Sequence, residues 1–146
     1  MKFDATRPVL SIETSCDDSS VAIVSVDGRV HFCQSRNQDS VHAPFGGIVP
    51  EIAGRNHTLY LLPLIEQALL ETGLGPQDLS GIAVTNRPGL IGSLFVGAAT
   101  AKSLAMAWDL PWIGVNHLEG HLLAGFLRDG TYSPIFSWDE SFVALA

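Results

Sequence analysis

The chain is poor in several residue types that define whole classes of protein. Its 146 residues include only two cysteines, too few for a disulfide-stabilised secreted domain and typical of a reduced compartment. Lys and Arg number 8 against 15 Asp and Glu, which gives a net charge of −7 and few cations for phosphate groups. We therefore do not expect a stand-alone nucleic-acid binder, and a role on nucleic acid would need a partner or a further basic segment.

Long uncharged apolar runs are also missing. No apolar stretch reaches 18 residues without a charge, so the sequence predicts no transmembrane helix. The N-terminal MKFDATRP has no apolar core of signal-peptide length. The composition, with 47% apolar and 16% charged residues, is instead typical of a globular chain that buries a real core. A cytoplasmic protein that does not contact a membrane is expected.

Apolar periodicity and turn residues predict an α/β fold. The expected elements, in chain order, are three antiparallel strands (8–14, 20–26, 29–36), a helix (50–73), a strand (81–86), a helix (93–108), a strand (112–115) and a last helix that follows residue 116. The order βββαβαβα predicts a mixed sheet whose later strands have parallel neighbours. The first helix is expected to present a periodic apolar face made of Ile52, Leu59, Leu62, Ile65 and Leu69.

Two histidines lie one helical turn apart in the stretch VNHLEGH. His117 and His121 would share one face of the last helix, where Asn116 can act as the N-cap. This spacing allows both imidazoles to reach one metal ion, but it also arises by chance. Glu119 is rotated about 200° from the first histidine, so the stretch differs from the zinc-peptidase pattern HExxH. A metal site normally needs three or four protein ligands, and the chain shows no obvious third.

Polar residues are concentrated at the tip of the first hairpin, in the stretch IETSCDDSS. Thr14, Ser15, Asp17 and Asp18 could hold a phosphate or a hydrated cation there, although a polar turn that satisfies its own backbone fits equally well. Glu13 interrupts an apolar strand, and a buried carboxylate needs a partner. The segment RPGLIGS (87–93) is a glycine turn before a helix, which suits an anion but is also an ordinary βα connection.

Four segments, in this order, resemble one family. They are LSIETSCDDSSVAIV, HAPFGGIVPEIAGRNH, VTNRPGLIGSLFVGAATAKSLA and VNHLEGH, and together they cover almost the whole chain. They are similar to the catalytic subunit of tRNA threonylcarbamoyladenosine synthase, a family with the older names O-sialoglycoprotein endopeptidase and glycoprotease. A smaller non-catalytic relative shares the first strand and the PGL segment but typically lacks the histidine pair and GGIVPE.

The resemblance implies a fold and a domain organisation. The family has the actin/sugar-kinase/Hsp70-like (ribonuclease H-like) fold, in which each of two lobes is a βββαβαβα unit. Residues 1–133 would form the N-terminal lobe, and residues 134–146 would begin a second lobe that this chain lacks. The last six residues, SFVALA, are expected to start a strand of that lobe.

The resemblance also implies a reaction, the transfer of threonylcarbamoyl from threonylcarbamoyl-adenylate to N6 of the adenosine beside the anticodon of ANN-decoding tRNAs. His117 and His121 would bind one divalent metal, iron or zinc. ATP or threonylcarbamoyl-adenylate would be the nucleotide ligand. The residues with catalytic roles would be Glu13, Asp17 and Asp18, and those that bind substrate or phosphate would be Thr14, Ser15 and Gly89. The implied partners are tRNA, a paralogous non-catalytic subunit and an ATPase subunit, and the resemblance leaves open a homodimer or a heterodimer.

One position departs from the family pattern. Arg87 stands before Pro88-Gly89 where the family usually has Gly. If this position requires a positive φ, Arg87 strains the loop; otherwise it places a cation near the cleft.

Two other functions remain as hypotheses. A metallopeptidase would match the older family name, but Glu119 is misplaced for it and the ligand set is incomplete. A non-catalytic scaffold of the same fold has no need of a histidine pair. The 146 residues alone are expected to be inactive, because half of the cleft would be missing, and their exposed inter-lobe surface is expected to be apolar and prone to association.

Overall fold

The computed structural model describes residues 2–128. Its elements are β1 (Val9–Glu13), β2 (Ser19–Val24), β3 (Val30–Arg36), α1 (Asp39–His42), η1 (Ala43–Phe45), α2 (Pro50–Thr72), η2 (Pro76–Asp78), β4 (Gly81–Arg87), α3 (Ile91–Trp108), β5 (Trp112–Asn116) and α4 (His117–Ala124). The predicted order of strands and long helices is confirmed. The short α1, η1 and η2 were not predicted, because one-turn helices are too short to show a periodic pattern. The expected second-lobe segment, 134–146, lies outside the described residues.

The five strands form one mixed sheet in the order β3-β2-β1-β4-β5. β1 pairs antiparallel with β2, and β2 with β3, whereas β1–β4 and β4–β5 are parallel. The predicted mixed sheet is confirmed. β4 and β5 are connected through α3, whereas between β1 and β4 the chain runs through β2, β3 and α2. A crossover is needed in both cases, because the end of one parallel strand and the start of the next lie at opposite ends of the sheet.

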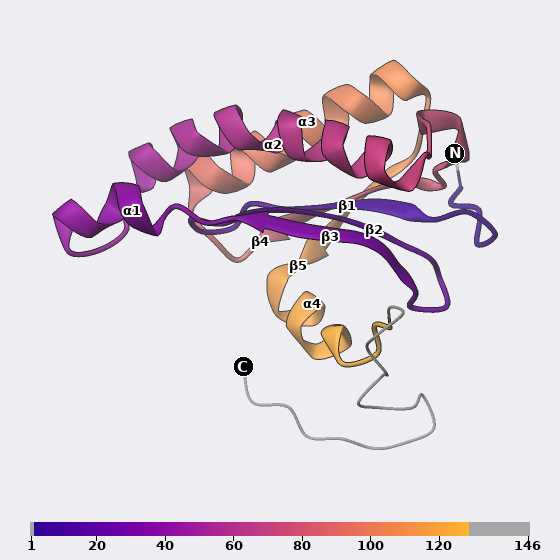
Figure 1. Ribbon diagram of the computed structural model, residues 1–146, viewed down its shortest axis with the longest axis horizontal. Helices are drawn as coiled ribbons and strands as arrows, with labels where there is room; N and C mark the ends of the chain where they lie inside the picture. Colours follow the sequence, from indigo (N-terminus) through magenta and orange to yellow (C-terminus); the bar gives the residue numbers. More distant parts are fainter. Residues whose placement is uncertain (1, 129–146) are drawn as a thin grey trace.

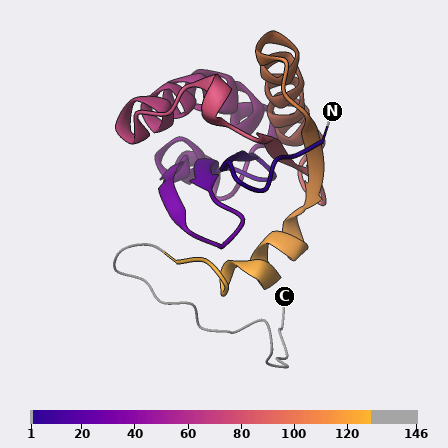
Figure 2. The ribbon, with the colours of Figure 1, turned by 90° about the vertical axis from the view of Figure 1, so that its right-hand side faces the viewer.

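Helices cover the two faces of the sheet unequally. In Figure 1, α2 and α3 lie together along one face, while α4 lies on the other. The view in Figure 2 shows the same two layers and the separate position of α4. The core lies between the sheet and the α2–α3 pair, where alternate strand residues such as Leu10, Ile12, Val21 and Ile23 are buried.

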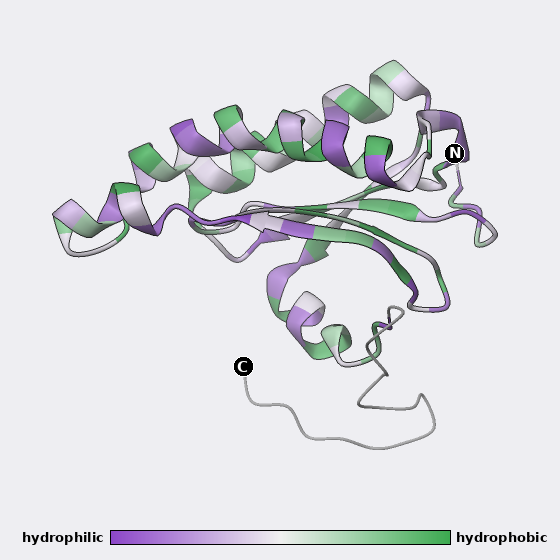
Figure 3. Ribbon diagram, viewed as in Figure 1, coloured by the Kyte–Doolittle hydropathy of each residue, from purple (hydrophilic) through white to green (hydrophobic). Residues whose placement is uncertain are grey.

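The buried face of α2 differs from the predicted one. Leu59 and Leu62 are 64% and 50% exposed, so their expected core positions are wrong. The residues that α2 buries are Ala53, His57, Leu61, Leu64, Ile65 and Ala68. Apolar residues occur around much of this helix (Figure 3), so periodicity alone left more than one possible buried face. The face that is buried is the one that packs on β2, β3 and α3.

The helix α3 qualifies by length and composition as a membrane span. It has 18 residues with a mean hydropathy of 1.2, and within residues 2–128 it is the one helix that meets these criteria. The sequence analysis did not predict a span here, because Lys102 interrupts the uncharged run. After the adjacent pair Ser93 and Leu94, its buried residues recur every three or four positions, at Gly97, Ala101 and Ala105. This spacing is that of a helix with one face packed on a sheet, and α3 packs on β4 and α2.

Candidate functional site

The carboxyl ends of the three parallel strands β1, β4 and β5 lie at one edge of the sheet. β1 ends at Glu13, β4 at Arg87 and β5 at Asn116, and the parallel pairing brings these carboxyl ends together. In open α/β sheets, ligands bind outside the carboxyl ends of parallel strands. The candidate site is therefore built where Glu13 and the start of α4 meet.

The two histidines converge at this edge. The Asn116 side chain accepts a hydrogen bond from the Leu118 N–H at 2.9 Å, which confirms the predicted N-cap and starts α4 at His117. The His117 and His121 rings meet edge to face with centroids 4.4 Å apart, and their Nε2 atoms are 2.9 Å apart. The expected i, i+4 geometry thus aims both Nε2 atoms at a common point.

A carboxylate supports His117 from behind. Glu13 Oε2 lies 3.0 Å from His117 Nδ1, and the Thr85 hydroxyl donates to the same oxygen at 2.5 Å. Because an ionised carboxylate only accepts hydrogen bonds, His117 Nδ1 carries the proton and its Nε2 is an acceptor. In this structure that Nε2 accepts from His121 Nε2–H, and it is the atom that would bind a metal. A carboxylate on the second nitrogen is what metal-binding histidines usually have, since it fixes the tautomer and orientation of the ring.

The ionisation of Glu13 follows from its contacts. Burial raises the pKa of its carboxyl, but hydrogen bonds from Ser15, Thr85 and His117 outweigh burial and hold the pKa below the ordinary value. The Ser15 backbone N–H donates to Glu13 Oε1. The sequence predicted that this carboxylate needs a polar partner, and the structure provides three donors, from Ser15, Thr85 and His117.

Predicted substrate residues on the hairpin have other contacts in the structure. The Thr14 hydroxyl is fully buried and donates to the Ser93 carbonyl at 2.9 Å, so it faces α3 and not the histidines. A Cβ at Gly89 would overlap the backbone of Ser15, and the Leu90 N–H donates to the Ser15 carbonyl at 2.7 Å. The PGL segment therefore packs directly against the hairpin, which requires glycine at position 89 for steric reasons.

Ser15 is the hairpin residue that reaches the histidines. Its Oγ lies 3.2 Å from His117 Nδ1, and it is nearly fully buried. Asp17 and Asp18 lie further along the tip, where Asp18 Oδ1 accepts a hydrogen bond from Asn37 at 3.1 Å. Burial, and then the neighbouring charge of Asp17, raise the pKa of the Asp18 carboxyl. The roles of all these residues stay predictions.

Arg87 is not strained. Asp109, with φ 54°, is the non-glycine residue in the left-handed region among residues 2–128, so the conformation of Arg87 is open to any residue. Arg87 is the exposed last residue of β4 and pairs in register with Asn116, next to His117. Of the two expectations for Arg87, the strained loop is wrong. The structure instead places its cation at the same edge of the sheet as the candidate site.

Two residues of the site were missed by the sequence analysis. Thr85 is buried at the end of a strand, where its hydroxyl completes the environment of Glu13. His57, which the sequence analysis did not single out as a functional residue, contacts the hairpin from α2. For Thr85, a polar residue in the apolar stretch GIAVTN was the available signal, whereas His57 stands beside Arg55, Asn56 and Thr58 and had no such signal.

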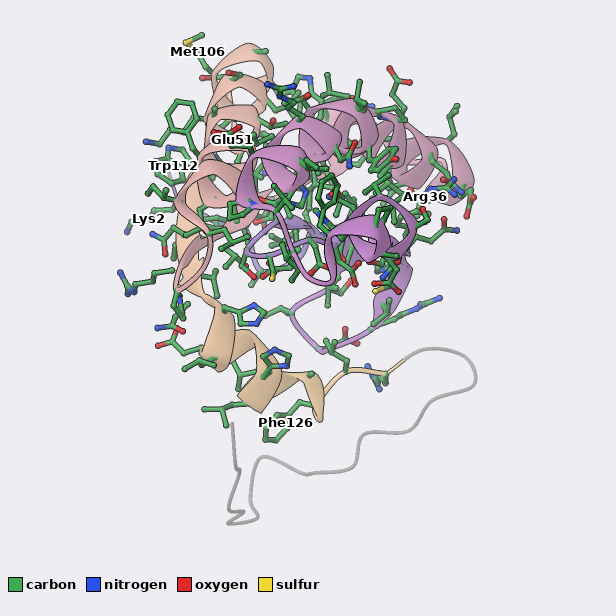
Figure 4. The ribbon with its side chains drawn as sticks, turned by 90° about the vertical axis from the view of Figure 1, so that its left-hand side faces the viewer. Lys2, Arg36, Glu51, Met106, Trp112 and Phe126 are labelled. Atoms are coloured by element: carbon green, nitrogen blue, oxygen red, sulfur yellow. The ribbon has the colours of Figure 1, made fainter. Side chains whose placement is uncertain are left out.

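A cavity of about 430 Å³ adjoins the histidines, between α4 and the sheet face that α2 and α3 leave open. Glu13, Thr85, His117 and His121 line its polar end, and most of its remaining wall is apolar. Figure 4 shows the labelled Phe126, which follows α4, at the bottom of the view beside that helix. The candidate site thus has polar groups at one end of an apolar cavity.

The donor set fits a metal ion in part. At Zn–N bond lengths of 2.0–2.1 Å, the nitrogens of a tetrahedral site lie roughly 3.3 Å apart, so these rings would need to separate by only about 0.4 Å. Imidazole suits zinc and iron alike. Within residues 2–128, no group of three or more His, Cys, Asp or Glu side chains could hold a metal, so further ligands must come from elsewhere.

Comparison with known proteins identifies the family. Residues 30–138 match the family model of tRNA N6-adenosine threonylcarbamoyltransferase, TsaD. The chain belongs to this family. The tRNA N6-adenosine threonylcarbamoyltransferase of Bdellovibrio bacteriovorus is 59% identical over 138 residues, which are 94% of this chain and 40% of the relative. The protein of the same name from Sorangium cellulosum is 52% identical over 122 residues, which are 84% of this chain and 34% of the relative.

The fold is also that of a solved structure. YeaZ from Pseudomonas aeruginosa superimposes with a TM-score of 0.57 at 23% identity, over 75% of this chain and 43% of that one. This likeness supports the predicted actin/sugar-kinase/Hsp70-like α/β lobe. The chain spans about two fifths of the length of the Bdellovibrio relative, so what the whole enzyme does must be argued separately.

Proposed function

We propose that this chain is the metal-binding lobe of an enzyme that transfers threonylcarbamoyl from threonylcarbamoyl-adenylate to N6 of the adenosine beside the anticodon of ANN-decoding tRNAs. The observation that carries the proposal is the pair of converging Nε2 atoms, 2.9 Å apart, with the Glu13 carboxylate on Nδ1 of His117. Relatives at 59% and 52% identity carry this enzyme name.

The described residues divide the work of the site. His117 and His121 would hold one divalent ion, iron or zinc, which when bound would supply positive charge to orient and polarise the acyl donor. Glu13 is committed to three donors and keeps the His117 ring in place, so its role is better described as positioning than as proton transfer.

The reaction itself needs an acceptor for one proton. The N6 amine attacks the carbamoyl carbon, the bond from that carbon to the adenylate phosphate oxygen breaks, and the N6 proton must leave. Asp17 and Asp18 are the hairpin carboxylates available for it, and the raised pKa of Asp18 favours a proton acceptor over a permanently ionised group. Ser15 and Gly89 would shape the wall that faces the nucleotide, ATP or threonylcarbamoyl-adenylate.

The remaining functional expectations concern partners and location. We propose that tRNA is bound through a complex with a paralogous non-catalytic subunit and an ATPase subunit in the cytoplasm, because a net charge of −7 disfavours tRNA binding by this chain alone. Arg87 would supply an exposed cation beside the site for an anionic substrate. The peptidase hypothesis receives no support, since the matched relatives are named as transferases and Glu119 is an exposed residue of α4.

A chimera tests the proposed function. The segment of this chain that aligns with the Bdellovibrio relative over 138 residues would replace the matching segment of that protein, in a strain depleted of its own enzyme. We expect threonylcarbamoyladenosine in total tRNA, measured by mass spectrometry of nucleosides, to be restored, and His117→Ala in the chimera to abolish it.

A matched substitution controls for folding. His31 is an exposed histidine on β3 whose ring contacts Ser25 and which is not among the residues that line the cavity. His31→Ala should leave the modified nucleoside unchanged. Normal levels of threonylcarbamoyladenosine in the His117→Ala chimera would contradict the catalytic proposal and favour a scaffold.

A further inference from the structure

His57 is a fully buried histidine that the proposed chemistry does not use. It lies on the inner face of α2 with no exposed surface, and both of its ring nitrogens contact the β1–β2 hairpin. Its Nε2 lies 3.0 Å from the Cys16 carbonyl, and its Nδ1 lies 2.7 Å from Ser19 Oγ. One imidazole thus links both sides of the short connection between β1 and β2 to a long helix.

The tautomer of His57 follows from these partners. A carbonyl oxygen only accepts hydrogen bonds, so Nε2 carries the proton and donates to Cys16. In the neutral ring Nδ1 is then an acceptor, and the Ser19 hydroxyl donates to it. Both polar atoms of the ring are satisfied, which a buried imidazole requires if it is not to destabilise the fold.

A second helix holds the same hairpin from its other side. The Leu90 N–H, just before α3, donates to the Ser15 carbonyl, and the Thr14 hydroxyl donates to the Ser93 carbonyl inside α3. A Cβ at Gly97 would overlap the Thr14 hydroxyl, so α3 is shaped for this close contact. Residues 14–19 are therefore held between α2 and α3.

The position of this hairpin determines the environment of His117. The Ser15 backbone N–H donates to Glu13, and Ser15 Oγ lies 3.2 Å from His117 Nδ1. Glu13 in turn contacts the same Nδ1 at 3.0 Å. A shift of the hairpin tip would displace both groups that fix the orientation of the His117 ring.

We propose that His57 is a positioning residue, which holds the β1–β2 hairpin between α2 and α3 so that Ser15 and Glu13 fix the ring of His117. The consequence for metal binding rests on the proposed function, whereas the restraint on the hairpin does not. The proposal connects the segment GGIVPEIAGRNH (46–57) to the candidate site through its last residue, His57, and not through its glycines.

The first test uses the unmodified chain. Long-range ¹H–¹⁵N spectra of the histidine rings report the tautomer of His57 directly. We expect a neutral ring with its proton on Nε2, protected from exchange with solvent. A ring protonated on Nδ1, or one in rapid exchange with water, would overturn the assignment without any substitution.

The second test compares two buried histidines. His42, on α1, is 4% exposed, and its Nδ1 accepts a hydrogen bond from the Val49 N–H, away from the hairpin, so it is a matched control. We expect His57→Leu to raise hydrogen exchange at the Ser15 and Leu90 amides at least tenfold relative to the core amide of Leu10, and to shift the His117 ring resonances. His42→Leu should change these ratios less than threefold, and equal effects of the two variants would overturn the proposal.

A third variant guards against loss of folding. The amide of His57→Gln can still donate to the Cys16 carbonyl, so this variant should recover part of the protection that His57→Leu loses. Exchange in His57→Gln as fast as in His57→Leu, with Leu10 still protected, would contradict the proposal.

Zinc titration separates this proposal from the proposed function. We expect His57→Leu to weaken zinc binding, followed through the His121 ring, about tenfold, while His42→Leu keeps the affinity of the unmodified chain. If the full-length chimera with the Bdellovibrio relative binds no zinc, the proposed function fails, and the exchange ratios still decide the role of His57.

Discussion

The place of Glu13 in an apolar strand predicted a polar partner, and the family resemblance implied a catalytic role, which stays a prediction. Its contacts in the structure are those of a group that supports His117. Three donors point at its two oxygens, and one of them is the imidazole nitrogen that a metal would not use. The chemistry that a side chain performs depends on which partners reach it, and those partners come from residues 15, 85 and 117.

Glu13→Gln should weaken zinc binding by the chain about 10–100-fold, because an amide holds the histidine tautomer less strongly than a carboxylate does. Glu119→Gln is the matched control, since Glu119 lies exposed on the same helix as the histidines. Both affinities can be measured by competition with a chromophoric chelator. Equal zinc affinities for the two variants would show that Glu13 does not support the site.

Asp18→Asn should stabilise the fold in a pH-dependent way. Burial and the charge of Asp17 raise the pKa of Asp18 in the folded state, so its ionisation destabilises the fold as the pH rises above the ordinary pKa. Well below that pH, Asp18 is neutral like the asparagine, and the two proteins should be equally stable. The asparagine keeps an oxygen for Asn37. Thermal unfolding should show a higher Tm for the variant at pH 7 and no difference at about pH 2.5; a gain confined to low pH would contradict the assignment.

The contact between the hairpin and the PGL segment is the element-scale feature on which the site depends. Gly89→Ala should cost about 1–3 kcal/mol, because its Cβ would overlap the Ser15 backbone. Gly92→Ala, in α3 with open space around it, should be neutral or stabilise by up to about 1 kcal/mol. Urea unfolding of both variants checks this pair, and similar stabilities would mean that the close contact is absent.

Arg87→Gly tests the corrected view of the same segment. If Arg87 were strained, restoring the glycine that the family usually has would stabilise the chain. Because its φ is not in the left-handed region, we expect the variant to lose roughly 0.5–1 kcal/mol through the extra freedom of its unfolded state. A rise in the free energy of unfolding, measured with urea, would revive the strained loop.

How far the sequence predicted the structure can be judged element by element. The strands, the two long helices and the Asn116 cap followed from periodicity and cap residues, because those signals are local. The buried face of α2 did not, because Leu59 and Leu62 have the same local pattern as Leu61 and Ile65, and only the position of α3 distinguishes them. Glu13 and Thr85 are 72 residues apart, so their contact had no local signal either.

At the scale of the whole molecule, apolar side chains remain exposed on the helical layer. They include Leu59, Leu62 and Leu70 on α2 and Ile91, Phe95 and Met106 on α3, each at least 50% exposed. Figure 4 shows Met106 projecting away from the body of the molecule. Exposed apolar groups in this number are typical of a surface that contacts another protein.

The chain should therefore associate weakly in solution as its concentration rises. Leu62→Lys should shift the association to higher concentration, because a charge on the exposed face of α2 opposes its burial. Sedimentation velocity over a range of concentrations measures both proteins. Identical sedimentation of the two proteins at all concentrations would exclude α2 from the association surface.

The central claim is that two imidazoles on one turn of α4 hold a single metal ion. The most direct measurement is a zinc titration of the uniformly ¹⁵N-labelled chain, followed through the ring nitrogens of all five histidines. We predict that the Nε2 resonances of His117 and His121 shift together and saturate at one equivalent, while those of His31, His42 and His57 stay in place. Shifts of one ring only, or independent shifts of the two rings, would contradict the claim.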